Sequence, residues 1–299
     1  MLITGSAILT LGTTENTGST GAVWYNTSTN QLNYSYLGPA AWSAGGSMIN
    51  GYSQNNSGAG SQTAALSIGG YPSTSCTEEY DGATWTAGGT LINGLRRGGG
   101  AGTQNAALAF GGNGGAFTNE YDGTTWTSGG ALNAGRYGLA GTGTQNAALA
   151  IGGYSAYGCT EIYDGTSWTV GASNSQTQRL SAAGTQNAAL AFGGRFTTTN
   201  SQEYDGSTWA SGGTLSVGGY CMAGAGTQNS ALAMGGLSGY YCTEEYNGTT
   251  WSVQNAMNNY RCGAAGAGTA AAGLVFGGYY PAAANSSEEF NVPMCICSV

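Results

Sequence analysis

The hydrophobic positions of the chain fall in short segments separated by Gly, Asn, Ser and Thr, and the stretch "AGTQNAALAFGG" at residues 101–112 is typical. In its apolar part, Leu108 and Phe110 alternate with alanines, so both faces of an extended strand are apolar. This pattern predicts an inner strand buried on both sides, with small side chains where a neighbouring sheet comes close around an axis. The Gly-Gly pair that follows lets the chain leave the strand with a positive φ.

The same pattern recurs six times at a nearly constant spacing. The Gly-Gly pairs begin at Gly69, Gly111, Gly152, Gly193, Gly235 and Gly277, and a Trp recurs at Trp42, Trp85, Trp126, Trp168, Trp209 and Trp251. Each series advances by 41 to 43 residues per copy. A period of this length is typical of a solenoid, a propeller or another repeat array.

Each unit predicts four short strands. The Gly-rich "GAGTQ" is the first, a Gln-Asn turn leads to "AALAF" as the second, and a variable loop follows the Gly-Gly pair. A segment such as "TEEY" is the third strand, Asp-Gly makes a tight hairpin, and "TTWTSGG" is the fourth. No segment shows sustained helical periodicity. The chain is therefore expected to be an all-β, six-bladed β-propeller with a period of about 42 residues.

The order of these features resembles the kelch repeat over roughly residues 38–292. The shared features are the Gly-Gly strand end, a Tyr shortly before the Trp in five copies, and an Arg ten or eleven residues after it at Arg96, Arg136, Arg179 and Arg261. The unit departs from the kelch pattern in its shorter length, its Ala-rich strands, and a Tyr in place of Arg at Tyr52 and Tyr220. The resemblance implies a kelch-like propeller.

The two ends of the repeat indicate how the ring closes. Trp42 precedes the first Gly-Gly pair, whereas no Trp follows Phe290 in the last unit. We therefore expect the strand around Trp42 to complete the C-terminal blade, which removes free sheet edges. Tyr36 and Phe290 both remain candidates for the third strand of that blade.

This reading divides the chain into three parts. Residues 1–37 form an N-terminal docking segment with a β-hairpin of strands at 23–25 and 31–36, residues 38–292 form the propeller, and residues 293–299 form a C-terminal tail.

Composition excludes several classes of function. The 299 residues carry a net charge of −8, with no Lys and no His, so the chain has no basic surface for nucleic acid. No apolar run is long enough to cross a membrane, so no membrane span is expected. The first residues contain no basic region, so no secretory signal is expected. Aromatic residues make up 11% of the chain and recur at fixed places, which argues against disorder.

Candidate catalytic chemistry is sparse, and we expect no enzymatic activity, no cofactor and no bound metal. All four Asp lie in the hairpins and every Glu except Glu15 lies just before a repeat aromatic, so these carboxylates are interpreted as turn formers and partners of the repeat Arg. Without His, neither a Ser-His-Asp triad nor the copper site of kelch-type oxidases can form. The "YDGTTW" hairpin is similar to the Asp-box of six-bladed sialidases, but with different spacing. Three cysteines share one repeat position and are interpreted as half-buried packing residues rather than ligands: Cys76, Cys159 and Cys242.

The segments that differ between units are the candidates for binding. Strand alternation places the loops after Gly-Gly and the connections after the fourth strands on one face, and the constant turns on the other. Loops on a rigid scaffold commonly carry binding. The candidate residues are Tyr240, Tyr241, Tyr279 and Tyr280, with Arg195 and Phe196 across the ring, and Tyr154 and Tyr157. The alternative, that these aromatics only cap the blades, is left open.

The segment "GAVWYNTSTNQLNYSY" resembles a module of bacteriophage tail-fibre and other virion appendage proteins, with Trp24 and Tyr25 as docking candidates. The resemblance implies a virion structural protein of the tail, baseplate or capsid surface, assembled in the host cytoplasm. Its partners are then other virion proteins, or a host-surface glycan or receptor protein, and a homo-oligomer is left open. The alternative is a cellular kelch-like interaction adaptor or surface adhesin.

Overall fold

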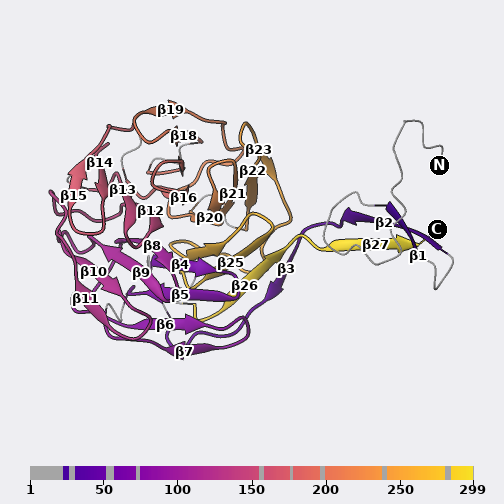
Figure 1. Ribbon diagram of the computed structural model, residues 1–299, viewed down its shortest axis with the longest axis horizontal. Helices are drawn as coiled ribbons and strands as arrows, with labels where there is room; N and C mark the ends of the chain where they lie inside the picture. Colours follow the sequence, from indigo (N-terminus) through magenta and orange to yellow (C-terminus); the bar gives the residue numbers. More distant parts are fainter. Residues whose placement is uncertain are drawn as a thin grey trace. The chain divides into compact units, whose positions relative to one another are not determined.

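A computed structural model describes residues 23–26, 31–51, 57–71, 75–154, 158–175, 178–195, 199–237, 241–279 and 284–298. The described residues form strands and turns without any helix. Six antiparallel four-stranded sheets are arranged in a ring, which confirms the predicted six-bladed β-propeller (Figure 1). The chain divides into two units, which are Trp42–Phe290 and the pair of segments Met1–Ala41 and Asn291–Val299.

Each blade is numbered along the chain, and its strands run outward from the axis of the ring. Blade 1 contains β4 (Ser57–Ser61), β5 (Ala64–Ile68), β6 (Thr77–Tyr80) and β7 (Trp85–Ala87), and blade 2 contains β8 (Gly99–Thr103), β9 (Ala106–Phe110), β10 (Thr118–Tyr121) and β11 (Trp126–Ser128). Blade 3 contains β12 (Ala140–Thr144), β13 (Ala147–Ile151), β14 (Thr160–Tyr163) and β15 (Trp168–Val170), and blade 4 contains β16 (Ser181–Gly184), β17 (Ala189–Phe192), β18 (Ser201–Tyr204) and β19 (Trp209–Ser211). Blade 5 contains β20 (Ala223–Thr227), β21 (Ser230–Met234), β22 (Thr243–Tyr246) and β23 (Trp251–Val253).

The Gly-rich first strands line the axis, and the Ala-rich second strands lie one layer further out, so the strand nearest the axis is not the one that the Ala pattern suggested. The first strands of neighbouring blades contact one another around the ring. Glycine is required by this close approach: a Cβ atom on Gly141 would lie 2.6 Å from the carbonyl oxygen of Gly100 in blade 2, and one on Gly266 would lie 2.5 Å from that of Gly224.

Large and small faces of the second strands interlock between blades. Leu108 and Phe110 of β9 pack against Ala148 and Ala150 of blade 3. The opposite, alanine face of β9 packs against Leu66 and Ile68 of blade 1. All of these side chains are fully buried, and burying each Leu or Phe contributes roughly 1.5–3 kcal/mol. The repeated "AALAF" therefore gives each blade a large face for the next blade and a small face for the previous one.

A hydrogen bond from the repeat Trp crosses every seam between blades. In each case the indole Nε1–H donates to the hydroxyl of the Thr or Ser at the third strand of the preceding blade, at 2.9–3.4 Å. The six pairs are Trp85–Ser287, Trp126–Thr77, Trp168–Thr118, Trp209–Thr160, Trp251–Ser201 and Trp42–Thr243. The Trp thus joins blades as well as filling the outer core.

A second bond joins the repeat Tyr to a carboxylate of the preceding blade at four seams. The donor–acceptor pairs are Tyr80–Glu289, Tyr121–Glu79, Tyr163–Glu120 and Tyr246–Glu203, at 2.5–2.6 Å. At one remaining seam Ile162 replaces the Glu, and the Tyr204 hydroxyl donates to its own hairpin at Gly206 instead. At the other, Phe290 replaces the Tyr, and burial raises the pKa of Glu245.

The Gln of the "GTQN" turn is a third contact between blades. Its side-chain amide donates to two backbone carbonyls of the preceding blade, as Gln104 does to Ala65 and Tyr80 at 3.1 and 2.7 Å. The same clamp is made by Gln62, Gln145, Gln186 and Gln228. The equivalent position in the last unit is Ala270, so the seam between blades 5 and 6 lacks this clamp.

Blade 6 is completed by the N-terminal strand, as predicted. It contains β24 (Ala265–Gly268), β25 (Ala272–Phe276), β26 (Ser287–Asn291) and, at its outer edge, β3 (Ala41–Ala44). The Trp42 ring lies 5.2 Å from that of Phe290, which reproduces the Tyr–Trp contact of the other blades. Phe290, and not Tyr36, therefore lies in the third strand.

The second unit is a three-stranded antiparallel sheet. Its strands, in the order β1-β2-β27, are β1 (Val23–Asn26), β2 (Gln31–Leu37) and β27 (Met294–Ser298). β1 and β2 form the hairpin, and Tyr36 of β2 pairs with Cys295 of β27. The segment 293–299, expected to be only a tail, thus contributes a strand to this sheet.

Candidate binding pocket at the mouth of the central channel

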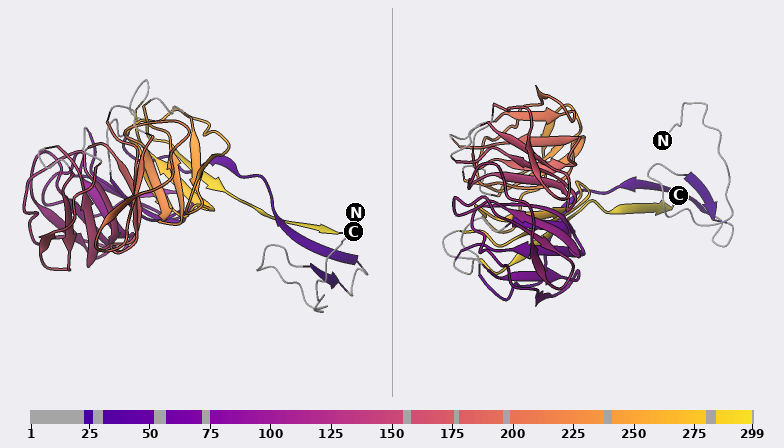
Figure 2. Two further views of the ribbon diagram at one scale, coloured as in Figure 1. Left: turned by 90° about the horizontal axis from the view of Figure 1, so that it is seen from above. Right: turned by 60° about the vertical axis from the view of Figure 1, so that its left-hand side comes forward.

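The ring has two chemically different faces, and Figure 2 shows it from two further directions. The connection face carries the loops after Gly-Gly and the connections after the fourth strands. Backbone hydrogen bonds hold these two kinds of segment together, such as Gly112 N–H to Arg136 C=O and Gly236 N–H to Arg261 C=O, both 2.8 Å. The hairpin face carries the "YDG" turns.

The Asp residues of the hairpin face serve the turns themselves. Asp81 accepts hydrogen bonds from the backbone N–H groups of Ala83 and Thr84 and from the Thr84 hydroxyl. These bonds lower the pKa of Asp81, with the backbone N–H of Thr84 contributing most. Asp122, Asp164 and Asp205 are bound in the same way, so the expected role as turn formers fits all four.

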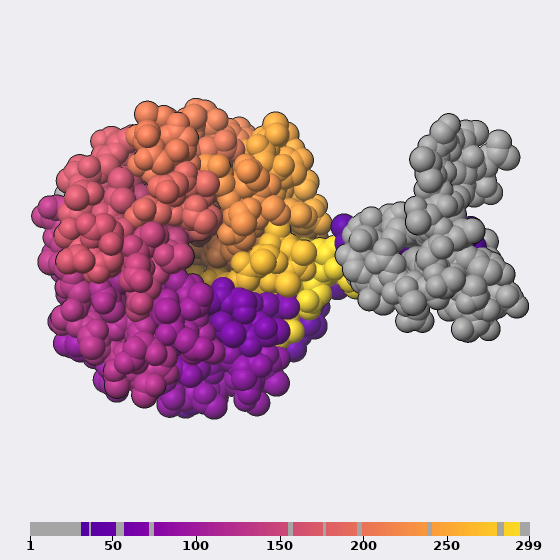
Figure 3. Space-filling view, viewed as in Figure 1, coloured from indigo at the N-terminus to yellow at the C-terminus, as the bar shows by residue number. Residues whose placement is uncertain are grey.

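A pocket opens on the axis of the ring, where Figure 3 shows a hollow at the centre. Its cavity measures about 120 Å³ and is lined mainly by glycine and alanine of the first strands. Three other lining residues carry chemistry, which are Arg97, Arg179 and Cys221. The lining, within the described residues, contains no carboxylate.

These three residues belong to one series of backbone contacts around the axis, here called the mouth ring, whose described members are Arg97, Gly138, Arg179, Cys221 and Gly263. Each backbone N–H donates to the carbonyl of the preceding member, from Gly138 to Arg97, Arg179 to Gly138, Cys221 to Arg179 and Gly263 to Cys221, at 2.6–3.0 Å. All five residues have a positive φ, between 54° and 70°. This backbone conformation favours glycine.

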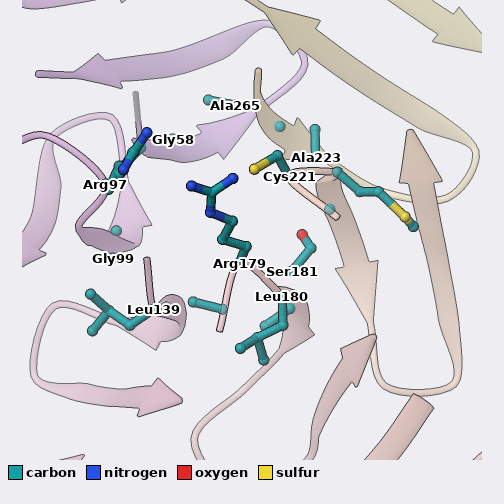
Figure 4. A pocket seen from close by; sticks show the side chains of 18 of the residues that line it. Gly58, Arg97, Gly99, Leu139, Arg179, Leu180, Ser181, Cys221, Ala223 and Ala265 are labelled. Carbon is teal, nitrogen blue, oxygen red and sulfur yellow. The ribbon is translucent and has the colours of Figure 1, made fainter. Parts of the chain in front are cut away.

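The Arg side chains of the mouth ring face the same space. In Figure 4, Arg179 reaches the middle of the pocket, with its guanidinium between Arg97 and the Cys221 thiol. Burial lowers the pKa of Arg97, and the charges of Arg179 and Arg96 lower it further. Two like charges thus converge in a site partly removed from water.

Tyr side chains pack against Arg179 and against Arg195 beside it. The guanidinium carbon of Arg179 lies 5.5 Å from the ring centre of Tyr220 and 6.0 Å from that of Tyr154. Arg195 lies 5.7 Å from the Tyr154 ring, which in turn stacks on Tyr137 at 4.6 Å and 9°. Cation–π contacts of this kind favour a fixed Arg orientation.

Two thiols of neighbouring connections interact beside the pocket. A hydrogen bond from Cys221 to Cys262 lowers the pKa of the Cys262 thiol and, with burial, raises the pKa of Cys221. The charge of Arg179 also lowers the pKa of Cys262. Both cysteines are free.

Four of the predicted binding residues lie within the described structure. Tyr154 is half-buried in the aromatic cluster beside Arg179, and Arg195 is exposed on the same cluster. Tyr241 and Tyr279 have exposed fractions of 48% and 44%, so both are accessible for contact. The remaining four, Tyr157, Phe196, Tyr240 and Tyr280, lie outside the described residues.

The expected position of Arg195 relative to the blade 5 tyrosine needs correction. Arg195 does not lie across the ring from that tyrosine, because it follows β17 in blade 4, and blade 4 adjoins blade 5, which carries Tyr241. Trp24 and Tyr25 lie in β1, where only the backbone is described. Their docking role stays a prediction.

The kelch-like Arg positions also need correction, because only two of the four share a role. Arg136 donates to Glu161 at 2.9 Å, and Arg261 donates to Glu288 at 3.1 Å, and both pairs are fully buried. Where Leu95 replaces this Arg, Asn119 replaces the Glu. Arg179 lies in the mouth ring, and Arg96 lies over the Tyr71 ring at 4.8 Å. The latter two belong to the connection face.

The sequence contains a signal for the mouth ring that counting from the Trp misses. The connection from the Trp varies in length, whereas the mouth-ring residue always lies seven positions before the turn Gln or its replacement, Ala270. Counting back from Gln104, Gln145, Gln186, Gln228 and Ala270 gives Arg97, Gly138, Arg179, Cys221 and Gly263. In this alignment, two units have Gly at the mouth-ring position, two have Arg and one has Cys.

No protein-family model matches the chain, and no curated protein matches it either. Within the described ranges, no helix is long and apolar enough to cross a bilayer. The same residues contain no group of three or more His, Cys, Asp or Glu side chains that could hold a metal ion. The expectation of no cofactor and no metal stays a prediction.

Proposed function

We propose that this chain is a virion structural protein of phage type whose connection face contacts a partner. The observation that carries the binding role is the difference between the two faces of a rigid ring. The hairpin face repeats one turn, whereas the connection face varies and presents exposed Tyr241 and Tyr279. A β-propeller is compatible with protein interaction or with a structural role, and variable loops on a rigid scaffold commonly bind.

The virion setting rests on the sequence. The segment around Trp24 and Tyr25 resembles phage tail-fibre and appendage modules, and the chain combines 7% charged residues with near-identical tandem repeats. Other virion proteins are the first partners that we propose, with a host-surface glycan or receptor protein as a second partner of the connection face. Assembly then takes place in the host cytoplasm.

We propose binding and not catalysis for the pocket. General acid–base catalysis needs a proton donor and acceptor placed on the substrate, most often His or a carboxylate. The chain contains no His, and the described pocket lining contains no carboxylate. The Cys262 thiol has no imidazole that could act as its base.

Particle imaging with the labelled chain tests the setting, and paired variants test the face. We expect the Tyr241→Ala, Tyr279→Ala double variant to reduce attachment to the particle or adsorption to the host by tenfold or more, because exposed tyrosines are common binding hot spots. Asp122→Asn on the hairpin face serves as the control and should leave both unchanged.

Two outcomes would count against the proposal. Loss of attachment with the hairpin variant alone would assign the contact to the opposite face. Particles that contain no copy of the chain would favour the cellular adaptor or adhesin.

A further inference from the structure

The mouth ring contains arginine where its backbone favours glycine. Arg97 and Arg179 have φ values of 60° and 54°, and Gly138 and Gly263 fill equivalent positions of the same ring. A non-glycine residue is disfavoured in this conformation, and such positions cluster at functional sites. The chain contains 56 Gly and only six Arg, so glycine is abundant and arginine rare. We infer that the two arginines are present for their side chains.

The buried arginines are balanced by carboxylates, whereas Arg179 has no carboxylate beside it in the described pocket lining. Arg136 and Arg261 each donate to a buried Glu and to backbone carbonyls. The described lining of the central pocket contains no carboxylate, and Arg179 lies close enough to lower the pKa of Arg97. The Nε–H of Arg179 is buried and has no hydrogen-bond partner among the described residues. An anion between the two guanidinium groups would relieve their repulsion.

The size of the cavity restricts the ligand. A volume of about 120 Å³ holds a few water molecules, or one group of the size of a carboxylate, sulfate or phosphate. A complete nucleotide or oligosaccharide does not fit inside. The planar guanidinium fork matches the oxygen spacing of these oxyanions, and the Tyr154 and Tyr220 rings hold Arg179 in place.

We propose that the central pocket binds one oxyanionic group, held between the guanidinium groups of Arg97 and Arg179. The group is either a free anion or the carboxylate of an acidic sugar whose ring stays outside, on the tyrosines around the mouth. This inference deepens the proposed binding role of the connection face. It rests on the proposed function only for the source of the anion, because binding of a free anion requires no particle and no host.

Calorimetric titration of the full chain at low ionic strength tests the site, with sodium sulfate, sodium phosphate, acetate and glucuronate as probes. We expect saturable binding of at least one probe, weakened tenfold or more by Arg97→Gln and by Arg179→Gln. Val170→Glu, on the exposed outer strand β15, lowers the net charge by the same amount and should change the affinity less than twofold. Arg97→Gly and Arg179→Gly suit the local backbone and should also lose binding without any loss of melting temperature.

The ranking of the probes identifies the source of the anion. Tighter binding of glucuronate than of acetate assigns the site to an acidic sugar, and tightest binding of sulfate or phosphate assigns it to a free oxyanion. The proposal is overturned by wild-type protein that binds none of the four probes at millimolar concentration. It is equally overturned if Val170→Glu weakens binding as much as the two pocket variants, because binding would then reflect only net charge.

Discussion

At each of the six seams between blades, a Trp indole donates to a Thr or Ser hydroxyl of the preceding blade, and the contact hardly changes from seam to seam. At the mouth of the channel, equivalent backbone positions hold Arg, Gly, Arg, Cys and Gly. The seams keep the repeat because each blade must fit the next. The mouth can depart from the repeat because its side chains face an open cavity. In this ring, copied residues serve the contacts between blades, and the departures at an unchanged backbone position are where we propose binding.

The largest effect should come from a buried arginine that holds a connection to its own blade. Arg136→Met leaves Glu161 buried without its partner, and removing one member of a buried ion pair costs about 3–5 kcal/mol. Denaturant unfolding should show this loss, and the double variant Arg136→Met, Glu161→Leu should recover most of it. Arg97→Met at the mouth is the matched comparison and should change the free energy of unfolding by less than about 1 kcal/mol. Equal losses at the two sites would remove the distinction between the buried, repeated ion pair and the mouth.

A second test uses alkaline pH against the seams. Burial and then the hydrogen bond to a Glu of the preceding blade raise the pKa of Tyr80, Tyr121 and Tyr163 from 10.0 to about 12. Because the folded pKa lies above the unfolded one, this stabilisation is fully present below pH 10 and is lost as the pH rises through about 12. Unfolding free energies measured across this window should fall, and phenolate absorbance of the folded protein should show delayed titration.

Tyr121→Phe provides the control for the alkaline test, because it removes one of the three groups. Its stability should depend less steeply on pH in the same window. Folded protein in which all tyrosines titrate near pH 10 would contradict the proposed seam bonds.

A smaller effect is expected from restoring a missing seam contact. Phe290→Tyr would give Glu245 the phenol donor that the four bonded Glu residues have, and a hydrogen bond to a charged group contributes about 1.5–3 kcal/mol. The variant should unfold at higher denaturant concentration, and the pKa of Glu245, now raised by burial, should fall. Destabilisation would show that the closing seam is packed differently from the others.

The smallest effect on the free energy of unfolding is expected at the mouth. There, two substitutions should stabilise the protein, whereas most substitutions destabilise a protein. Arg97→Gly and Arg179→Gly should each stabilise the protein by about 0.5–1 kcal/mol, because a positive φ costs glycine less than arginine. Gly138→Ala places a Cβ in the same ring and should destabilise by a similar amount. Thermal melts of the three variants decide this prediction, and destabilisation by both glycine substitutions would show that the arginines serve the fold.

The blades and their closure could be predicted because the signals are local. The Gly-Gly pairs mark the strand ends, the Trp spacing gives the repeat length, and Trp42 without a preceding unit predicts the closing strand. The choice between Tyr36 and Phe290 stayed open because both are aromatic residues at the end of a strand pattern. Only the pairing of β26 with β25 and β3, and of β2 with β27, separates them.

Contacts between units were harder to foresee. The sequence alone predicts a turn role for the Gln of "GTQN", yet its amide binds carbonyls of the preceding blade, 39 and 24 residues earlier in the case of Gln104. Arg179 was assigned to the kelch-like position because the connection after the Trp varies in length. A count from the Gln, at the start of the rigid inner hairpin, places it correctly beside Arg97.

The completion of blade 6 by β3 has a consequence for the way the protein is made. Ser287 of β26 donates to the carbonyl of Gly46, just after β3, and the two residues are 241 positions apart in the chain. During synthesis, blades 1 to 5 can fold in order through contacts between neighbours, while β3 waits without a partner until β26 has left the ribosome. A polypeptide that ends early therefore presents open strand edges that chaperones and proteases recognise, and only the finished chain conceals them.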